Sequence, residues 1–371
     1  MTTIDHIEVV IADIPTIRPH VLAMATMHSQ AVVLLFLRRS DGIVGLGEAT
    51  TIGGLAYGEE SPESMKVNIE TYFAPLLKTC DADDPASAMA LLEKHIVGNR
   101  FAKCAVETAL YDGLGHAEGK PVSDYFGGAQ TGRLEVAWTL ASGDTGADID
   151  EGERMLAERR HRHFKLKIGK RDVAADCAHV AAIARAFEGR ASVRVDVNQA
   201  WSREQASEGA SLLQDAGVAL VEQPLAKDDV EGMAALAARH EIAIMPDEAL
   251  QGPVSAGRLA AARAGDVFAL KIAQSGGLSK AREVATIARK AQIALYGGTM
   301  LEGGVGTAAS AHLFASLPPM EWHTELFGPL LMTEEILTDP LNYGDFGLDL
   351  PSGPGLGVTV DRDRLETFRR A

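Results

Sequence analysis

Single charged residues recur at regular intervals through the second half of this 371-residue sequence, each near the end of a short apolar run. Asp196 falls late in SVRVDVN, Glu222 in LVEQPL, Asp247 in IAIMPDE and Lys271 in VFALKIA. Successive members lie 26, 25 and 24 residues apart. A strand and its helix take up about this much chain, so parallel strands would bring the four charges to one ring at their carboxyl ends.

Two lysines alternate with apolar residues in HFKLKIGK, residues 163–170. A solvated edge strand shows the same alternation, but Lys165 and Lys167 hold the place in their run that the single charges hold in theirs. In VRVDVN the valines would face the helices, which turns Asp196 and Asn198 inward. We therefore predict that both lysines line the mouth of a site. Glu325 ends the last β-rich run and is a weaker candidate, because a buried ion pair would explain it equally well.

Three converging carboxylates repel one another unless a cation lies between them. Asp196, Glu222 and Asp247 form an all-oxygen set that suits a hard divalent ion, Mg²⁺ or Mn²⁺. Lysines beside such an ion have a lowered pKa and can accept a proton. The set predicts proton transfer next to a substrate carboxylate, with lysines on either side of the substrate. Any one of these carboxylates alone is better explained as a strand-end salt bridge, and only their conjunction favours the site.

The elements that must position these residues follow a regular rhythm from Thr131 onward. Eight β-rich runs alternate with alanine-rich stretches of helical period, which predicts a (β/α) barrel, with a doubly wound sheet as the alternative. Before them, alternating runs around the turn at residues 40–42 predict an antiparallel sheet, and residues 64–114 are helical in pattern. We predict an α+β capping domain over 1–130, a barrel over 131–326 and a tail over 327–371 that packs back on the capping domain.

Composition excludes some partners. The net charge of −16 argues against nucleic acid or an anionic membrane as a partner. The sequence also has no run of about 18 consecutive apolar residues, the length expected of a membrane-spanning helix. Three isolated cysteines, Cys80, Cys104 and Cys177, favour a reducing compartment, so we expect a cytoplasmic protein. We also expect His161 and His163 at the surface. The glycines of YGGTMLEGGVG, residues 296–306, predict a tight turn next to the substrate.

These motifs resemble those of the enolase superfamily, specifically its muconate lactonising subgroup. The matching short motifs are, in order, the KxK at 165–167, VDVNQ, VEQP, the Asp-Glu pair at 247–248 and LKIA. Longer segments match as well and are more specific: TIRPH at 16–20, EATTIGGLAYG at 48–58, AWTLASGD at 137–144, LYGGTMLEGG at 295–304 and TELFGPLL at 324–331. The resemblance covers nearly the whole chain.

The resemblance implies a modified TIM barrel, (β/α)₇β, in place of eight full units, with an α+β capping domain at the N-terminus. It implies that Asp196, Glu222 and Asp247 bind one Mn²⁺ or Mg²⁺. Lys167 would be the main acid and base, Lys165 would support it, and Lys271 would act on the opposite face. Loops around 20–24 and 52–57 would close over the substrate. The residues expected to contact substrate are His20, Ile52, Leu55, Tyr57, Asn198 and Phe327, with Glu325 as a further catalytic group.

The expected reaction is the reversible lactonisation of cis,cis-muconate, a small dicarboxylate, to muconolactone in aromatic-compound catabolism. The resemblance also implies a homo-oligomer, an octamer in related enzymes. Gln274-Ser275 depart from the lysine-asparagine pair expected there, which leaves chloro- and methylmuconates open as substrates.

Other lysine-dependent racemases and epimerases of the superfamily share the lysines and carboxylates. A dipeptide epimerase would carry Asp-x-Asp where HTE stands at 323–325, and a mandelate-racemase-like enzyme would carry a histidine in ALYGGT. A Schiff-base aldolase has no use for three carboxylates. A non-enzymatic binding protein would be expected to have lost some of these groups, and none is missing.

Overall fold

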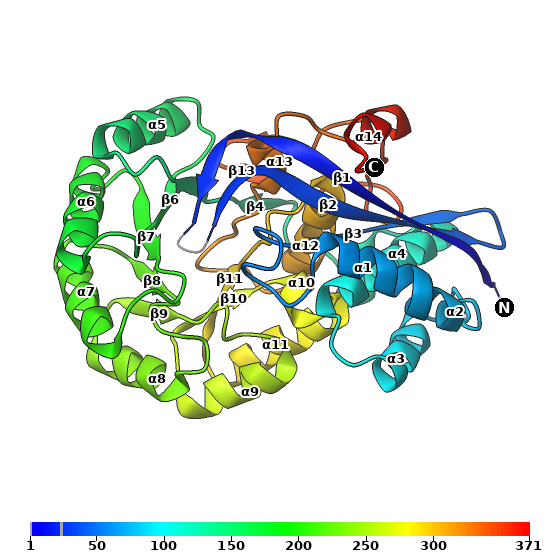
Figure 1. Ribbon diagram of the computed structural model, residues 1–371, viewed down its shortest axis with the longest axis horizontal. Helices are drawn as coiled ribbons and strands as arrows, with labels where there is room; N and C mark the ends of the chain where they lie inside the picture. Colours follow the sequence, from blue (N-terminus) through cyan, green and yellow to red (C-terminus); the bar gives the residue numbers. More distant parts are fainter. Residues whose placement is uncertain (1, 23–24) are drawn as a thin grey trace.

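The computed structural model describes residues 2–22 and 25–371, which form a barrel with a smaller sheet-and-helix part beside it (Figure 1). The small part begins with an antiparallel sheet of strands β1 (Ile4–Val21), β2 (Thr26–Arg39) and β3 (Val44–Thr50), in that order. The predicted turn joins β2 to β3, and Gly42 adopts the left-handed φ of +88° that glycine tolerates. The far end of the β1–β2 hairpin reaches the barrel (Figure 1), so this sheet can contribute side chains to a site there.

Helices cover one side of this sheet, as the pattern over 64–114 predicts. They are α1 (Pro62–Asn68), a π-helical turn (Ile69–Phe73), α2 (Ala74–Leu77), α3 (Pro85–His95) and α4 (Arg100–Glu118). Helix α4 packs directly on β3. A Cβ on Gly45 would lie 2.0 Å from the Ala109 carbonyl, and one on Gly47 would lie 1.9 Å from the Ala105 carbonyl. Only glycine permits so close an approach of strand to helix.

The barrel strands are parallel and bring the predicted charges into neighbouring rows. Five of them form one sheet: β5 (Trp138–Leu140), β6 (His163–Lys167), β7 (Ser192–Asp196), β8 (Leu220–Glu222) and β9 (Ala243–Met245). Two more, β10 (Val267–Leu270) and β11 (Ala294–Gly297), pair with each other. Thr324 bridges both Val136 and Gly297, so the last strand position closes the barrel.

A helix follows each of the first seven strand positions on the outside of the barrel (Figure 1). These helices are α5 (Thr145–Ala157), α6 (Val173–Ala186), α7 (Arg203–Asp215), α8 (Val230–Arg239), α9 (Pro253–Ala262), α11 (Leu278–Lys290) and α12 (Gly304–Ser316). Four of them begin at a capping side chain that accepts a backbone N–H: Asp144, Asp172, Ser202 and Asp229. The closing strand lacks a long helix, so the barrel is (β/α)₇β, and the predicted fold class is confirmed.

The tail returns to the first part of the chain. Strands β12 (Tyr343–Gly344) and β13 (Gly347–Asp349) extend a small sheet with β4 (Arg133–Glu135), and α14 (Arg362–Phe368) lies near β1. Beyond α14, Arg370 pairs with Asp13 at 2.5 Å. The α14 and Arg370 contacts reach residues of the predicted capping domain, whereas β4 lies in the range predicted for the barrel. The three domain ranges stay predictions.

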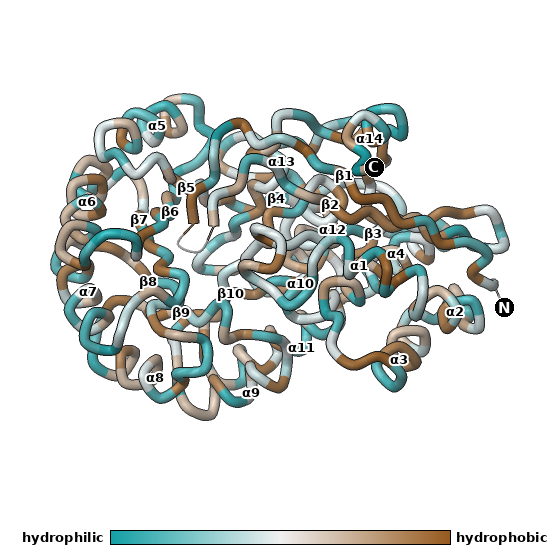
Figure 2. Tube along the Cα trace, in the orientation of Figure 1, coloured by the Kyte–Doolittle hydropathy of each residue, from teal (hydrophilic) through white to brown (hydrophobic). Residues whose placement is uncertain are grey.

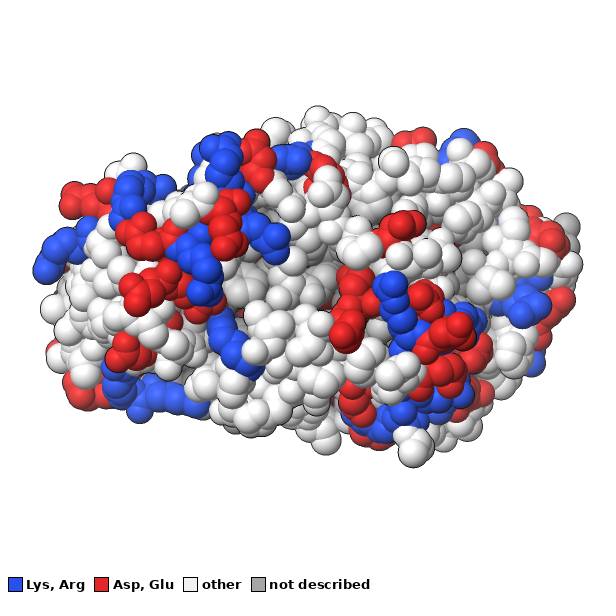
Figure 3. Space-filling view, turned by 90° about the horizontal axis from the view of Figure 1, so that it is seen from above, with Lys and Arg blue, Asp and Glu red and all other residues white. Residues whose placement is uncertain are grey.

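Hydropathy follows the architecture: the strands of the first sheet are mostly apolar, and the helices α5 to α9 around the barrel mix polar and apolar residues (Figure 2). On the face seen in Figure 3, acidic and basic side chains are interspersed at both ends and sparse in the middle, so the negative net charge makes no single patch there. Within the described residues, no helix combines the length and apolarity needed to cross a membrane.

The prediction that His161 and His163 are surface residues is wrong. Their exposed fractions are 1% and 9%. His161 stacks on Trp138 with 5.1 Å between ring centroids, and its Nδ1 lies 2.8 Å from the Val136 carbonyl. The tail reaches the same end of the barrel, where the Phe346 backbone donates its N–H to the Arg159 carbonyl at 2.8 Å and accepts from the Val136 N–H at 3.0 Å through its carbonyl. The local pattern of the sequence contains no sign of these distant contacts.

Candidate active site

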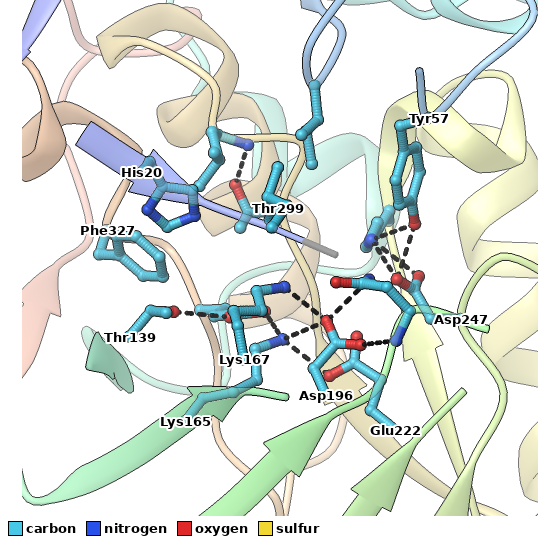
Figure 4. A pocket seen from close by; sticks show the side chains of 16 residues that line it. His20, Tyr57, Thr139, Lys165, Lys167, Asp196, Glu222, Asp247, Thr299 and Phe327 are labelled. Carbon is cyan, nitrogen blue, oxygen red and sulfur yellow. Dashed lines mark hydrogen bonds and ion pairs between the residues drawn. The ribbon is translucent and has the colours of Figure 1, made fainter. Parts of the chain in front are cut away.

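Twelve of the thirteen predicted site residues line one pocket at the carboxyl ends of the barrel strands (Figure 4). They are His20, Ile52, Tyr57, Lys165, Lys167, Asp196, Asn198, Glu222, Asp247, Lys271, Glu325 and Phe327. Residues from the first sheet and its following loop thus meet residues from six strand positions around the barrel. This is the face on which parallel barrels carry their functional groups.

The three carboxylates converge at the ends of consecutive strands. Asp196 and Glu222 are the last residues of β7 and β8 and stand opposite each other in register, and Asp247 follows β9 closely. All three are buried, and one oxygen from each lies within 4.8 Å of the others. An all-carboxylate set of this kind has the chemistry of a site for a hard divalent ion, so the residues fit the predicted metal.

Charge within this cluster is balanced by lysines. Burial and the charge of Asp196 raise the pKa of Glu222 well above its usual value. Burial acts in the same direction on Asp196, but Lys167 and Lys165 outweigh it and lower the pKa of that carboxyl. Three carboxylates in a buried site therefore need positive charge beside them.

Lys165 and Lys167 project into the pocket from β6, so the lysine face of HFKLKIGK is an inner wall and not a solvated one (Figure 4). Lys165 Nζ donates to Glu222 at 2.7 Å and to Glu325 at 2.6 Å, and Lys167 Nζ donates to Asp196 at 2.5 Å. Burial alone would lower the pKa of Lys165, but Glu222 and Glu325 raise it. The sequence predicts a lowered pKa for the lysines only on the assumption that a cation lies beside them. In the structure the neighbouring carboxylates raise the pKa of Lys165 instead.

Lys271 lies on the far side of the pocket, in contact with a tyrosine from the capping loop. Its Nζ is 2.7 Å from both oxygens of Asp247 and 2.7 Å from the Tyr57 hydroxyl. That hydroxyl donates to Asp247 at 2.6 Å and lies 3.1 Å from Gln274 Oε1. Burial, followed by Asp247 and Glu248, raises the pKa of Tyr57 well above its usual value, so the phenol keeps its proton. Lys271 is thereby held opposite the lysine pair.

The β1–β2 hairpin closes one side of the pocket. His20 is buried there, and burial followed by the charge of Lys167 lowers its pKa to about 3, so its imidazole is neutral. Its Nδ1 has no hydrogen-bond partner among the described residues. Residues 23–24 of the predicted capping loop over 20–24 lie outside the residues that the structure describes. Ile52 and Phe327 give the pocket apolar walls, but Leu55 is 67% exposed and does not line it, so that prediction is wrong.

Sequence reasoning missed four pocket-lining residues: Leu22, Thr139, Thr299 and Leu301. Thr139 pairs in register with Lys165 across neighbouring strands, a signal that requires knowing the pairing. Thr299 and Leu301 lie in the glycine-rich segment, which makes the predicted turn beside the pocket, with Leu301 at a left-handed φ of +59°. Gln274 was noted only as a departure from the expected pattern. Its amide donates to the Asp247 and Leu250 carbonyls at 2.5 and 2.8 Å.

A barrel with carboxylates on three successive strands and lysines on both sides defines a class of enzyme, and comparison with known families agrees. Residues 6–127 match the mandelate racemase / muconate lactonizing enzyme N-terminal domain, and residues 147–364 match the enolase C-terminal domain-like family. The chain therefore belongs to the mandelate racemase and muconate lactonizing enzyme family of the enolase superfamily.

Individual relatives are more specific. Muconate cycloisomerase 1-2 of Acinetobacter lwoffii is 59% identical over 99% of this chain and 95% of its own length. Muconate cycloisomerase 1 of Pseudomonas putida is 52% identical over 99% and 98%, and the chloromuconate cycloisomerase of Pseudomonas putida is 42% identical over 99% of both. The muconate lactonizing enzyme from Pseudomonas fluorescens, solved in complex with muconolactone, superposes with a TM-score of 0.98 at 53% identity over all of both chains.

Proposed function

We propose that this chain catalyses the reversible lactonisation of cis,cis-muconate to muconolactone. The observation that carries the proposal is the pocket itself, with Lys165 and Lys167 on one wall, Lys271 on the other and three carboxylates beside them. Identity supports the parent diene: the muconate cycloisomerases compared are 52–59% identical to this chain, and the chloromuconate enzymes 41–42%. The same comparisons disfavour a racemase, an aldolase or a non-enzymatic role.

Asp196, Glu222 and Asp247 would hold one divalent ion, which we propose to be Mn²⁺ or Mg²⁺. When bound, such an ion supplies positive charge next to a substrate carboxylate and favours the negative charge that develops there. Asn198 supports this arrangement, because its backbone N–H donates to Asp196 at 2.9 Å and its side-chain amide donates to Asp196 at 3.1 Å and to Glu248 at 3.2 Å.

Lys167 is the proposed acid and base. In the forward direction an oxygen of one muconate carboxylate forms a bond to the conjugated alkene, and the displaced electron pair moves toward the other carboxylate. The Lys167 ammonium then gives its proton to the carbon next to that carboxylate, and the neutral amine removes it in the reverse reaction. Lys165 bonds to Glu222 and Glu325, which fixes it beside Lys167 as a source of positive charge.

The remaining residues position the substrate. Ile52 and Phe327 offer the apolar walls that a flat conjugated diene needs. Nδ1 of His20, which has no hydrogen-bond partner among the residues that the structure describes, can hydrogen-bond to a substrate oxygen. Lys271 and Tyr57 form the opposite wall, so the diene would lie between the two sets of lysines.

The test is the loss of ultraviolet absorbance from cis,cis-muconate with added Mn²⁺, with 3-chloromuconate measured in parallel. Fast loss on the parent diene that disappears in Lys167→Ala supports both the reaction and the role of Lys167. Faster turnover of 3-chloromuconate would mean that the chlorinated diene, and not cis,cis-muconate, is the preferred substrate. No loss on either diene, with the ion bound, contradicts the proposed substrate.

We also propose that the protein is a cytoplasmic homo-oligomer. Cys80, Cys104 and Cys177 are all free and buried, which suits a reducing compartment. Light scattering during gel filtration measures the oligomeric state, and a mass close to the 39.4 kDa of a single chain would contradict this expectation.

A further inference from the structure

Two histidines and a glutamate meet at the amino end of the barrel, on the face opposite the catalytic pocket. His163 begins β6, the strand whose other end carries Lys167, and Glu135 ends β4. His323 directly precedes Thr324, which closes the barrel. One ligand atom from each of the three residues lies within 4.8 Å of the others. The proposed reaction uses none of these groups.

We propose that Glu135, His163 and His323 form a second metal site, for a borderline divalent ion such as Zn²⁺, on the amino face of the barrel. Two imidazoles and one carboxylate are a common zinc set that leaves a fourth position for water. Mg²⁺ and Mn²⁺ prefer the all-oxygen set of the catalytic pocket. The two sites of this chain would therefore differ in the kind of ion they select.

Neighbouring side chains fix the orientation of the carboxylate in this site. Arg162 donates to the two Glu135 oxygens at 2.6 and 2.9 Å, and His163 Nε2 lies 2.8 Å from Oε2. The carboxylate is therefore directed at the imidazole with which it would share an ion.

His163 and Glu135 already hydrogen-bond to each other through the two atoms that would bind the ion. His163 Nε2 lies 2.8 Å from Glu135 Oε2, and its Nδ1 lies 2.7 Å from the Ser192 hydroxyl. The carboxylate can only accept, so Nε2 carries the proton and Nδ1 accepts from Ser192. An ion on Nε2 takes the place of that proton. The imidazole proton then resides on Nδ1 and is donated to Ser192 Oγ, the outer-shell bond that usually orients a ligand histidine.

His323 supplies the third ligand after a rotation of its side chain. Its ring stacks on His163 with centroids 4.0 Å apart and an angle of 24°, so coordination requires the ring to tilt out of the stack. The Glu135 side chain is 29% exposed, which leaves a path for an ion. Arg162 and Arg194 lie nearby and oppose a dication, so binding will be weaker than at a closed structural zinc site.

An ion here would join β4, just before the first barrel strand, to the closing strand of the barrel. Thr324 already donates its backbone N–H and its hydroxyl to the Glu135 carbonyl at 3.0 and 2.8 Å. A ligand on either side of this junction, together with one from β6, would tie the closing strand in place. We therefore expect Zn²⁺ to raise the melting temperature as well as to bind.

The test is calorimetric titration of Zn²⁺ into the full chain in excess Mg²⁺, which occupies the carboxylate site. We expect one Zn²⁺ per chain in the native protein and none in the double variant His163→Gln/His323→Gly. Glycine suits position 323 because its φ is +63°. Ser192→Ala should weaken binding about 10- to 100-fold by removing the outer-shell partner. His28→Gln, at an exposed histidine, should bind as the native chain does.

Two further variants test whether Zn²⁺ binds at Glu135, His163 and His323 and not in the catalytic pocket. Glu135→Gln changes little volume and should lower the Zn²⁺ affinity, which guards against a double variant that fails to fold. Asp196→Asn, in the catalytic pocket, should leave Zn²⁺ binding intact. No Zn²⁺ uptake in excess Mg²⁺ would overturn the proposal, as would uptake that persists in the double variant or disappears in Asp196→Asn.

Discussion

Lys271 is contacted by a group from the far end of the chain. The Tyr57 hydroxyl lies 2.7 Å from its Nζ, although 214 residues separate the two in the sequence. The same hydroxyl bonds to Asp247, while the Gln274 amide holds the Asp247 carbonyl. A single phenol thus connects the capping loop to a proposed metal ligand and a proposed acid-base group.

Removing this hydroxyl should reduce catalysis. A hydrogen bond to a charged group contributes about 1.5–3 kcal/mol, so Tyr57→Phe should lower kcat/KM roughly 10- to 100-fold. Steady-state kinetics on cis,cis-muconate measure the effect, with Tyr72→Phe, at an exposed tyrosine, as the matched control. Unchanged kcat/KM in Tyr57→Phe would show that the hydroxyl does not position Lys271.

Stability should fall below neutral pH because of a second buried residue, His161. Burial lowers its pKa from 6.5 to about 4. Between these values the unfolded chain binds a proton that the folded chain does not, so the free energy of unfolding falls as the pH drops from 6.5 towards 4. The contribution of this group is about 2 kcal/mol at pH 5.

Urea unfolding at pH 7 and pH 5 tests this linkage. In His161→Phe, which retains a ring against Trp138, the loss of stability between the two pH values should shrink by about 2 kcal/mol. His28→Asn, at an exposed position, serves as the control. An equal pH dependence in native protein and His161→Phe would contradict the assignment.

At the scale of elements, side chains of β2 and β3 hydrogen-bond to the turn that precedes α12 and to the first turn of that helix. Gln30 donates to the Met300 and Leu301 carbonyls at 3.1 and 2.9 Å. Glu48, near the end of β3, accepts the backbone N–H groups of Gly303 and Gly306 at 2.5 and 2.9 Å. Thr299 and Leu301 of this turn line the pocket, so the capping sheet supports the pocket wall from behind as well as closing it.

Loss of the Glu48 carboxyl group should destabilise the fold. Each buried backbone donor left without a partner costs about 1–3 kcal/mol, so Glu48→Ala should lower the free energy of unfolding by roughly 2–6 kcal/mol. Urea unfolding measures the change, with Glu59→Ala, at an exposed glutamate, as the comparison. A loss no larger than that of Glu59→Ala would mean that water satisfies these donors.

At the scale of the whole molecule, the proposed ion connects three successive strands of the barrel. Its ligands end β7, end β8 and follow β9, so the ion can bind only when these strands are in register. Binding to the folded chain alone stabilises it by mass action. Ion binding therefore also reports whether these three barrel strands are correctly folded.

Adding Mg²⁺ or Mn²⁺ should raise the melting temperature. At an ion concentration 100 times the Kd the stabilisation is about 2.7 kcal/mol. Asp247→Asn should lose most of this shift, whereas Asp215→Asn, at an exposed position, should keep it. Scanning calorimetry with and without the ion measures both, and an equal shift in Asp247→Asn would place the ion elsewhere.

The sequence by itself determined the alternation of parallel strands with helices and the gathering of the charges at one end of the strands. Strand alternation has a period of two, so Lys165 and Lys167 had to share a face. Parallel strands separated by helices all end on the same side, so regular spacing brought Asp196, Glu222 and Asp247 together. Both arguments are local, because each needs only the neighbouring residues and the repeat of the βα unit.

Only the tertiary structure decided which distant segments meet. The contact of Tyr57 with Lys271, the burial of His161 and the stacking of His163 on His323 depend on how the loop after β3, the tail and the closing strand dock on the barrel. Docking is set by the complementarity of whole surfaces and by strand register. Neither leaves a periodic trace in a single sequence, so these contacts could not be predicted from it.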